Sequence, residues 1–350
     1  MLPAFLHQPP AIPMNRHLFS QPIVAVALAL AGLASQPAAA YDSIVVFGDS
    51  LSDSGNNAAA GLFDPAQVIT GNGYVPTNTY ASGTYSNGPV WATSFASALG
   101  VSLMPSLLGG TNFAFGGATT GTPGSNAGGF PYRLLTQTQQ FLTTPGRVVS
   151  PDGLYVVAGG GNNARAALDL IGGGANFATT AATFAAAFAA DIGSIVDSLQ
   201  LAGAEDIIVW NTPNLGLAPA LAATPFSGAA SFLASIMNQA LALRLSTEVG
   251  VETFDLYGFA TGIAANPGAF GFTNAVDACG KANGPDCATS LFYDGIHPSA
   301  AGHLAIAEAM LALAVTPVPE PETYALMLAG LAALGWRARR RSAPVVAATA

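Results

Sequence analysis

The 350-residue chain has few charged side chains, and the shortage is greatest among the basic ones, with 10 lysines and arginines against 19 acidic residues. The basic residues within 41–316 are far apart in the sequence, at Arg133, Arg147, Arg165, Arg244 and Lys281. A nucleic-acid site needs clustered basic side chains that neutralise phosphates, so we expect no nucleic-acid partner. No G-x-G-x-x-G motif or P-loop follows a predicted strand, which disfavours a nucleotide-binding enzyme, and the absence of G-x-S-x-G disfavours the α/β-hydrolase fold.

Cysteine and histidine are also scarce. Cys279 and Cys287 are the two cysteines, and they lie in a loop-like stretch rich in Gly, Asn and Pro. In an exported protein we expect such a pair to form a disulfide. The histidines of residues 41–316 are His297 and His303, and this set matches no zinc pattern. The sequence therefore predicts neither a metal site nor a cofactor.

The N-terminus has the features of an export signal. Arg16 supplies a positive charge, an apolar run covers residues 23–33, and alanines at 38–40 provide the small residues of a cleavage site. We expect residues 1–40 to be a signal peptide, with Met14 as a possible true start. A retained membrane anchor is the alternative, although the apolar run is shorter than the about 20 residues that span a bilayer.

The C-terminus carries a tail of three parts: Val-Pro-Glu-Pro-Glu at 318–322, an apolar stretch at 324–336, and arginines between 337 and 341. This order resembles the PEP-CTERM sorting signal of Gram-negative bacteria, which an exosortase-type membrane protease reads. The resemblance implies export to the periplasm, the cell surface or the medium, with transient membrane association through the tail. A simple hydrophobic anchor is the alternative. We expect a working domain at 41–316, a sorting signal at 317–341 and a short tail at 342–350.

Apolar runs within that domain alternate with helical patterns. The predicted strands are at residues 43–47, 112–115, 154–158, 206–210 and 251–254, and the predicted helices are at 179–201, 228–249 and 298–314. This alternation favours an α/β fold whose parallel sheet is covered by helices on both faces. Such sheets bind ligands beyond the carboxyl ends of their strands. The aperiodic stretch at 55–89 predicts a long loop near that edge.

Ser50 follows the first predicted strand, in Gly48-Asp49-Ser50. A serine on a tight turn between a strand and a helix is exposed to ligand and lies near helix amides, as a nucleophile requires. The triplet alone is more often a turn or a helix cap. We interpret Asp49 and Asp53 as stabilisers of this turn, because neither has the sequence position of a triad acid.

Asp294 and His297 supply what a nucleophilic serine needs, a base for its proton and a carboxylate that orients the base. Their spacing lets the carboxylate bond one ring nitrogen while the other faces the serine. The alternative is a helix N-terminus with a surface histidine. His303 could compete for the role of base, but it lies in a predicted helix and no carboxylate directly precedes it. We therefore interpret His303 as a packing residue.

Two Gly-rich segments reach the same edge of the predicted sheet, at residues 110–118 and 158–163. Glycine lets a backbone amide approach a ligand closely, and an Asn side chain adds a neutral N–H donor. Such donors can stabilise the oxyanion that forms during acyl transfer. Either segment alone is usually only a turn.

Together, Gly-Asp-Ser at 48–50, the two Gly-rich segments and Asp-Gly-Ile-His at 294–297 resemble the GDSL/SGNH hydrolase family, in that family's order. The resemblance implies a three-layer α/β/α flavodoxin-like fold with a central, mainly parallel five-stranded sheet. It also implies a serine hydrolase acting on carboxylic esters, with Ser50 as nucleophile and with Asp294 and His297 as its acid and base.

The resemblance further assigns the oxyanion donors to the amides of Ser50 and Gly117 and to the side chain of Asn162. Gly116 is the alternative to Gly117 under a shift of one residue. The chain departs from the family's pattern at Asn163, where an aspartate is usual, and this puts the role of that position in doubt.

Five aromatic residues in and just after the long loop bear on the substrate: Phe63, Tyr74, Tyr80, Tyr85 and Trp91. They favour a lipase or carboxylesterase acting on acyl esters. Because aromatic rings also stack on sugars, an O-acetyl esterase of extracellular polysaccharide is the nearest alternative. A non-catalytic surface or matrix protein that binds through the same fold is the alternative from another class.

Overall fold

A computed structural model of the chain describes residues 41–73, 78–121, 129–314 and 330–332. The predicted signal peptide and all of the predicted sorting signal except residues 330–332 lie outside these residues. The strands and the helices that pack on them lie within residues 41–314.

Four parallel strands form one sheet, in the order in which they occur along the chain. They are β1 (Ser43–Gly48), β2 (Gly153–Ala158), β3 (Asp206–Trp210) and β4 (Val251–Phe254). Every residue of β2 is buried, as expected for a strand that is covered on both faces. The pairing register sets Gly48 beside Ala158, so the carboxyl ends of β1 and β2 lie level.

The prediction of a fifth strand at residues 112–115 is wrong. This segment runs parallel to β1, and the amide of Phe113 donates to the carbonyl of Val46 over 2.7 Å, but it forms an isolated bridge with β1 instead of a regular strand. The amide of Gly48, which a continued parallel ladder would pair with the carbonyl of Phe113, instead donates to the side chain of Gln137 over 2.8 Å. A side chain thus takes the place of the next ladder bond.

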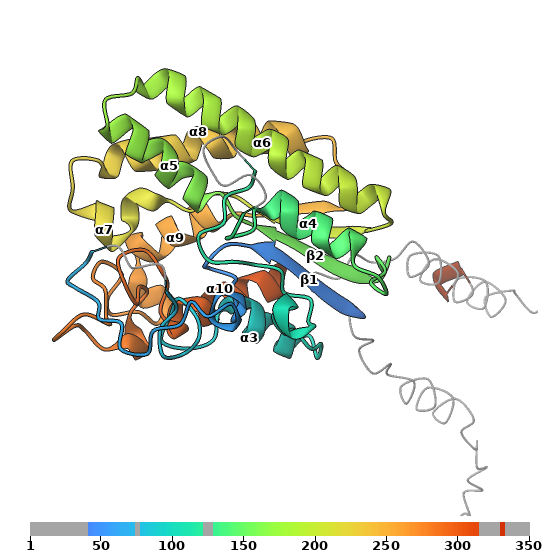
Figure 1. Cartoon of the computed structure of the whole chain (residues 1–350), viewed down its shortest axis with the longest axis horizontal. Helices are drawn as coiled ribbons and strands as arrows, with labels where there is room; N and C mark the ends of the chain where they lie inside the picture. The colour runs from blue at the N-terminus through green and yellow to red at the C-terminus, as the bar shows by residue number, and fades with distance from the viewer. Residues whose placement is uncertain (1–40, 74–77, 122–128, 315–329, 333–350) are drawn as a thin grey trace, which may run out of the picture. The chain divides into compact units, whose positions relative to one another are not determined.

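Helices cover both faces of the sheet, which confirms the predicted three-layer α/β/α architecture (Figure 1). One layer contains α4 (Leu134–Thr143), α5 (Gly161–Gly172), α6 (Phe177–Leu201) and α8 (Ser227–Leu245). The other layer contains α3 (Trp91–Ala98), α10 (Ala300–Ala314) and the start of α9 (Leu256–Ala265). The short helices α2 (Asn56–Ala59) and α7 (Pro219–Ala222) belong to connecting loops.

The two helical layers pack against opposite faces of the same strands. The rings of Trp91 and Trp210 lie 4.6 Å apart between their centroids and join α3 to β3.

By length and composition α6 could cross a bilayer, yet 56% of its most apolar window is buried inside the domain. Helix α8 ends at Leu245, four residues before the predicted end, and the β-branched Thr247 and Val249 then lead to Gly250 at a positive φ of 71°.

Candidate active site

Ser50 lies in a tight turn directly after β1. The amides of Ser52 and Asp53 both donate to the carbonyl of Asp49 over 3.0 Å, and the carboxylate of Asp49 accepts the amide of Leu51, also over 3.0 Å. The turn closes against β2, because a Cβ at Gly48 would lie 2.8 Å from the carbonyl oxygen of Ala158. These contacts fix Ser50 at the carboxyl end of the sheet, where α/β proteins bind their ligands.

Ser50, His297 and Asp294 form a continuous chain of hydrogen bonds. The hydroxyl oxygen of Ser50 lies 2.8 Å from Nε2 of His297, and Nδ1 of the same ring lies 2.6 Å from Oδ2 of Asp294. All three side chains are buried. The other oxygen of Asp294 accepts the amides of Ile296 and His297, each over 2.7 Å. In this geometry a base faces the serine while a carboxylate holds the far nitrogen of its ring.

Tyr80 adds a further donor to the buried carboxylate, a role that its place in an aperiodic loop does not predict. Its hydroxyl donates to Oδ2 of Asp294 over 3.1 Å, so that oxygen binds both Tyr80 and His297. Burial, and then the negative charge of Asp294, raise the pKa of Tyr80 above its ordinary value. The tyrosine therefore stays protonated and remains a donor.

Tyr85 braces the ring of His297 from another side. The two ring centroids lie 5.3 Å apart, at an angle of 34° between the planes. The side-chain amide of Asn57 donates to the hydroxyl of Tyr85 over 2.7 Å and to the carbonyl of Gly116 over 3.1 Å. A Cβ at Gly116 would lie 2.2 Å from the tyrosine ring, so glycine is required there. Tyr85 thus packs the base and the first Gly-rich segment together.

Three of the five aromatic residues on which the interpretation of the substrate rests are buried. Tyr80, Tyr85 and Trp91 are 3%, 4% and 0% exposed. Phe63 is 43% exposed, and Tyr74 lies outside the described residues. The buried rings offer no face for stacking on a sugar.

Asn162, at the start of α5, lines one small pocket together with Ser50 and His297. Its side-chain amide gives one hydrogen to the carbonyl of Ala118 over 2.9 Å, which leaves the second hydrogen for a ligand. The first Gly-rich segment is thereby tied to the same pocket.

The two candidate glycines differ in what their amides do. The amide of Gly116 donates to the carboxylate of Asp53 over 2.9 Å. Within the described part of the chain, the amides of Gly117 and Ser50 have no acceptor. Gly117 adopts a positive φ of 84°, which suits glycine. Occupation of the Gly116 amide therefore favours Gly117, beside Ser50 and Asn162, as the source of the oxyanion donor.

The acidic residues beside the serine have different environments. Asp53 accepts the amides of Gly55, Asn56 and Asn57 as well as that of Gly116, and burial raises its pKa. Asp49 is also buried, and burial raises its pKa to about 6. Both carboxylates accept backbone amides and so hold the turn in shape.

Asn163 stands where the family usually has an aspartate. Its side-chain oxygen accepts the amide of Thr120 over 3.1 Å, and its nitrogen donates to the hydroxyl of Thr120 over 2.8 Å. That hydroxyl in turn donates to the carboxylate of Asp191, on α6, over 2.7 Å. Asn163 therefore binds the chain that leaves the first Gly-rich segment, and a carboxylate from another helix completes the network.

His303 is buried in α10, where its Nδ1 accepts the amide of Trp91 over 3.2 Å. Burial, and then the charge of His297, lower the pKa of His303 to about 3. It is therefore neutral and bound to the backbone of α3, away from the hydrogen bonds of Ser50.

Cys279 and Cys287 form a disulfide across a separation of eight residues. The amides of Cys279 and Gly280 donate to the carbonyls of Phe292 and Tyr293, over 3.0 and 2.9 Å. The closed loop thus supports the segment that leads to Asp294. Among residues 41–73, 78–121 and 129–314, no group of three or more His, Cys, Asp or Glu side chains could hold a metal ion.

Comparison with known proteins gives two family matches. The GDSL-like lipase/acylhydrolase family matches residues 44–310, and the PEP-CTERM protein-sorting motif matches residues 317–341. The motif indicates export and surface sorting, as in Gram-negative bacteria.

Individual proteins are similar to this chain in sequence or in structure. Esterase EstA of Pseudomonas aeruginosa is 30% identical over 355 residues, which cover 85% of this chain and 51% of EstA. The phosphatidylcholine-sterol acyltransferase of Aeromonas hydrophila is 27% identical over 263 residues, which cover 73% of this chain and 69% of the relative. The solved structure of an extracellular lipase from Streptomyces rimosus has a TM-score of 0.41 and 20% identity, covering 77% of this chain and 97% of the lipase. The chain spans about half the length of EstA.

Proposed function

The chain belongs to the family of GDSL-like lipases and acylhydrolases, and from that premise we propose that it is an exported serine hydrolase that cleaves carboxylic esters through an acyl-enzyme on Ser50. The observation that carries the proposal is the unbroken hydrogen-bonded chain from Ser50 through His297 to Asp294. A lipase or carboxylesterase acting on acyl esters is the substrate class we propose.

In the first half of the reaction, Nε2 of His297 takes the hydroxyl proton of Ser50 while Oγ attacks the ester carbonyl. The carbonyl oxygen becomes an oxyanion, which accepts hydrogen bonds from the amides of Ser50 and Gly117 and from the side chain of Asn162. Asp294 stabilises the imidazolium and keeps the ring oriented. The intermediate then collapses, the alcohol leaves with the proton from His297, and the acyl group remains on Ser50.

The second half repeats these steps with water as the nucleophile. His297 takes a proton from the water, the new tetrahedral intermediate occupies the same donors, and Ser50 leaves with the proton from the ring. The products are a carboxylic acid and the free enzyme. No redox step is needed.

We further propose that residues 1–40 direct export and that 41–316 form the catalytic domain. The tail at 317–341 would be processed by an exosortase-type protease, with transient membrane association before cleavage. The match of the sorting motif to residues 317–341 supports this arrangement.

Hydrolysis of p-nitrophenyl acetate and butyrate by the full chain tests the proposal. We expect Ser50→Ala and His297→Ala to lower turnover by about 10⁴-fold or more. Ser54→Ala, from the same turn, and His303→Asn, from the other histidine, are the matched controls and should keep most of the rate. Activity that survives in both Ser50→Ala and His297→Ala would overturn the mechanism.

A further inference from the structure

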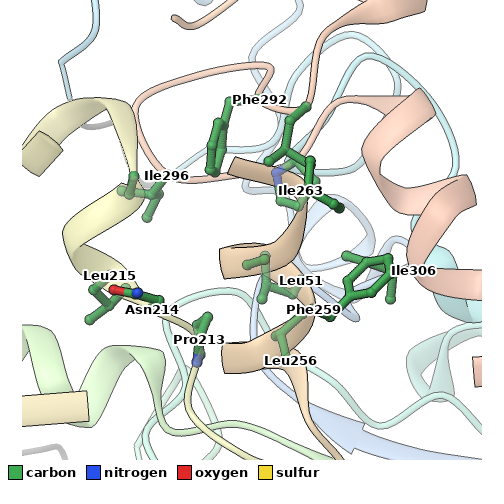
Figure 2. A pocket seen from close by; sticks show the side chains of 14 residues that line it. Leu51, Pro213, Asn214, Leu215, Leu256, Phe259, Ile263, Phe292, Ile296 and Ile306 are labelled. Carbon is green, nitrogen blue, oxygen red and sulfur yellow. The ribbon is translucent and has the colours of Figure 1, made fainter. Parts of the chain in front are cut away.

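An apolar pocket lies at the carboxyl ends of three strands. Figure 2 shows the side chains that line it. Leu51 enters it from the turn after β1, Leu215 from the loop after β3, and Leu256 from the start of α9 after β4. This is the position of a small-molecule site in an open α/β sheet.

The pocket adjoins the pocket of Ser50. Four residues, Leu51, Pro213, Leu215 and Ile296, line both this pocket and the small pocket that contains Ser50, Asn162 and His297. Leu51 directly follows the serine, and Ile296 directly precedes the histidine. Only these shared side chains therefore separate a group attached to a carbonyl at Ser50 from the apolar space.

The lining restricts what the pocket can hold. Asn214 supplies the one polar side chain among the described lining residues, and most of its amide is engaged: its nitrogen donates one hydrogen to Thr261 over 3.1 Å and its oxygen accepts Ser231 over 2.7 Å. The other lining side chains are aliphatic or aromatic, as Figure 2 shows for Phe292, Ile263 and their neighbours. A sugar or glycerol hydroxyl placed there would lose its hydrogen bonds with water and gain at most one, from the second amide hydrogen of Asn214. An alkyl chain makes no hydrogen bonds with water, so it loses none when it enters the pocket.

We propose that this pocket binds the acyl chain of the ester, so that the protein selects esters of longer acyl groups over acetates. The inference rests on the proposed function, because it takes Ser50 as the acylated residue. In esters of polyols the alkyl chain is on the acyl half, while the alcohol half carries hydroxyls that need solvent. The alcohol half therefore leaves toward solvent, and the acyl half occupies the apolar space.

The size of the selectivity follows from burial. Each methylene that leaves water for an apolar environment raises kcat/KM by about fourfold, if the chain is held equally in the transition state. The value of kcat/KM should therefore rise with each methylene added to the acyl chain until the chain fills the pocket, and then level off.

Two isomeric esters separate the acyl half from the alcohol half. Ethyl octanoate and octyl acetate have the same composition and hydrophobicity, but the long chain is on opposite sides of the carbonyl. We expect the wild-type full chain to hydrolyse ethyl octanoate at least tenfold faster in kcat/KM. Equal rates, or a preference for octyl acetate, overturn the assignment of the pocket to the acyl chain.

A variant locates the selectivity in this pocket. Ala260, on α9, lines it, so Ala260→Phe should fill it and lower kcat/KM for p-nitrophenyl octanoate at least tenfold, with the acetate within about twofold. Ala265→Phe, at the exposed end of the same helix, is the matched control and should change neither rate. An unchanged octanoate rate in Ala260→Phe, or equal losses on both esters in a protein that melts like the wild type, overturns the proposal.

The outcomes also distinguish failure of the acyl-chain pocket from failure of the proposed ester hydrolysis. If acetate is hydrolysed in a Ser50-dependent way but the rate does not rise with acyl length, the pocket assignment fails and the hydrolase remains. If Ser50→Ala retains the activity of the wild type on every ester, the proposed mechanism fails, and the acyl assignment fails with it.

Discussion

Tyr80 and Asp294 are separated by 214 positions in the chain, yet the tyrosine hydroxyl donates a hydrogen bond to the carboxylate over 3.1 Å. The same oxygen of Asp294 accepts Nδ1 of His297 over 2.6 Å. The loop after β1 thus reaches the residue that orients the base, and its tyrosine takes part in setting the charge beside the imidazole. A hydrogen bond to a buried charged group is worth about 1.5–3 kcal/mol.

Tyr80→Phe removes that donor while keeping the ring. We expect kcat/KM to fall about tenfold, because the carboxylate that orients His297 loses one of its donors. Tyr293→Phe, in the ring packed edge-on at 4.9 Å from Tyr80, is the control and should keep the rate of the wild type. A Tyr80→Phe rate within about twofold of the wild type would mean that Tyr80 only packs.

Asn162→Ala tests the side-chain donor of the oxyanion site. The expected loss is about 10²–10³ in kcat with little change in KM, because the donor acts on the charge that develops in the transition state. Asn176→Ala is a matched control: Asn176 caps α6 by accepting the amide of Thr179, so its loss should cost about 1 kcal/mol of stability and no activity. If KM rises and kcat stays the same in Asn162→Ala, Asn162 binds the ground state and is not an oxyanion donor.

Asp49→Asn tests the buried carboxylate beside the nucleophile through stability. Burial raises the pKa of Asp49 from 3.8 to about 6, so between these values the folded protein binds a proton more tightly than the unfolded chain. Stability therefore falls as pH rises through this window, and above it the ionised group destabilises the fold. Asparagine removes that cost and can still accept the amide of Leu51. We expect a higher Tm for Asp49→Asn at about pH 8, and a difference that shrinks toward about pH 4.

Thermal unfolding at several pH values measures this effect, with Asp152→Asn as the control for loss of one surface charge. Asp152 is exposed, so its replacement should shift Tm little at any pH. A gain for Asp49→Asn that is the same at acidic and alkaline pH would contradict the assignment to a buried ionisation.

The double change Cys279→Ser with Cys287→Ser tests the disulfide. The closed loop is short, so its loss should lower the free energy of unfolding by about 2–3 kcal/mol. Because the loop is hydrogen-bonded to Phe292 and Tyr293, ahead of Asp294, we also expect the activity to become heat-sensitive before global unfolding. Thermal unfolding and residual activity after heating, each with and without reductant, measure the two effects. A wild type whose stability and activity do not change with reductant would contradict the stabilising role of the disulfide.

The sequence predicts the parts of this protein that depend on local pattern. Alternating strands and helices indicate the layers, and the Asp294–His297 spacing indicates which side chains can act together. The fifth strand could not be excluded from sequence, because residues 112–115 have a strand's composition. Their ladder with β1 is interrupted by the side chain of Gln137, which binds the amide of Gly48 and lies 89 residues from it in the chain.

The roles of Tyr80 and Tyr85 also depend on long-range contacts. Their loop has little periodicity, and an aromatic residue in such a loop is equally consistent with a substrate platform or with a packed ring. Only the fold sets Tyr80 against Asp294 and Tyr85 against His297. The apolar pocket is likewise assembled from loops after three strands, so no single stretch of sequence shows it.

Covalent labelling of the full chain with a fluorophosphonate, followed by mass spectrometry of its peptides, tests the central claim most directly. An activated serine displaces fluoride and retains the phosphonyl group. We expect one adduct, on the peptide that contains Ser50, formed at a rate that falls sharply in His297→Ala, while Ser50→Ala remains unlabelled. A wild type that is not labelled while it hydrolyses esters, or an adduct on another residue that accounts for the activity, would contradict the assignment of Ser50 as the nucleophile.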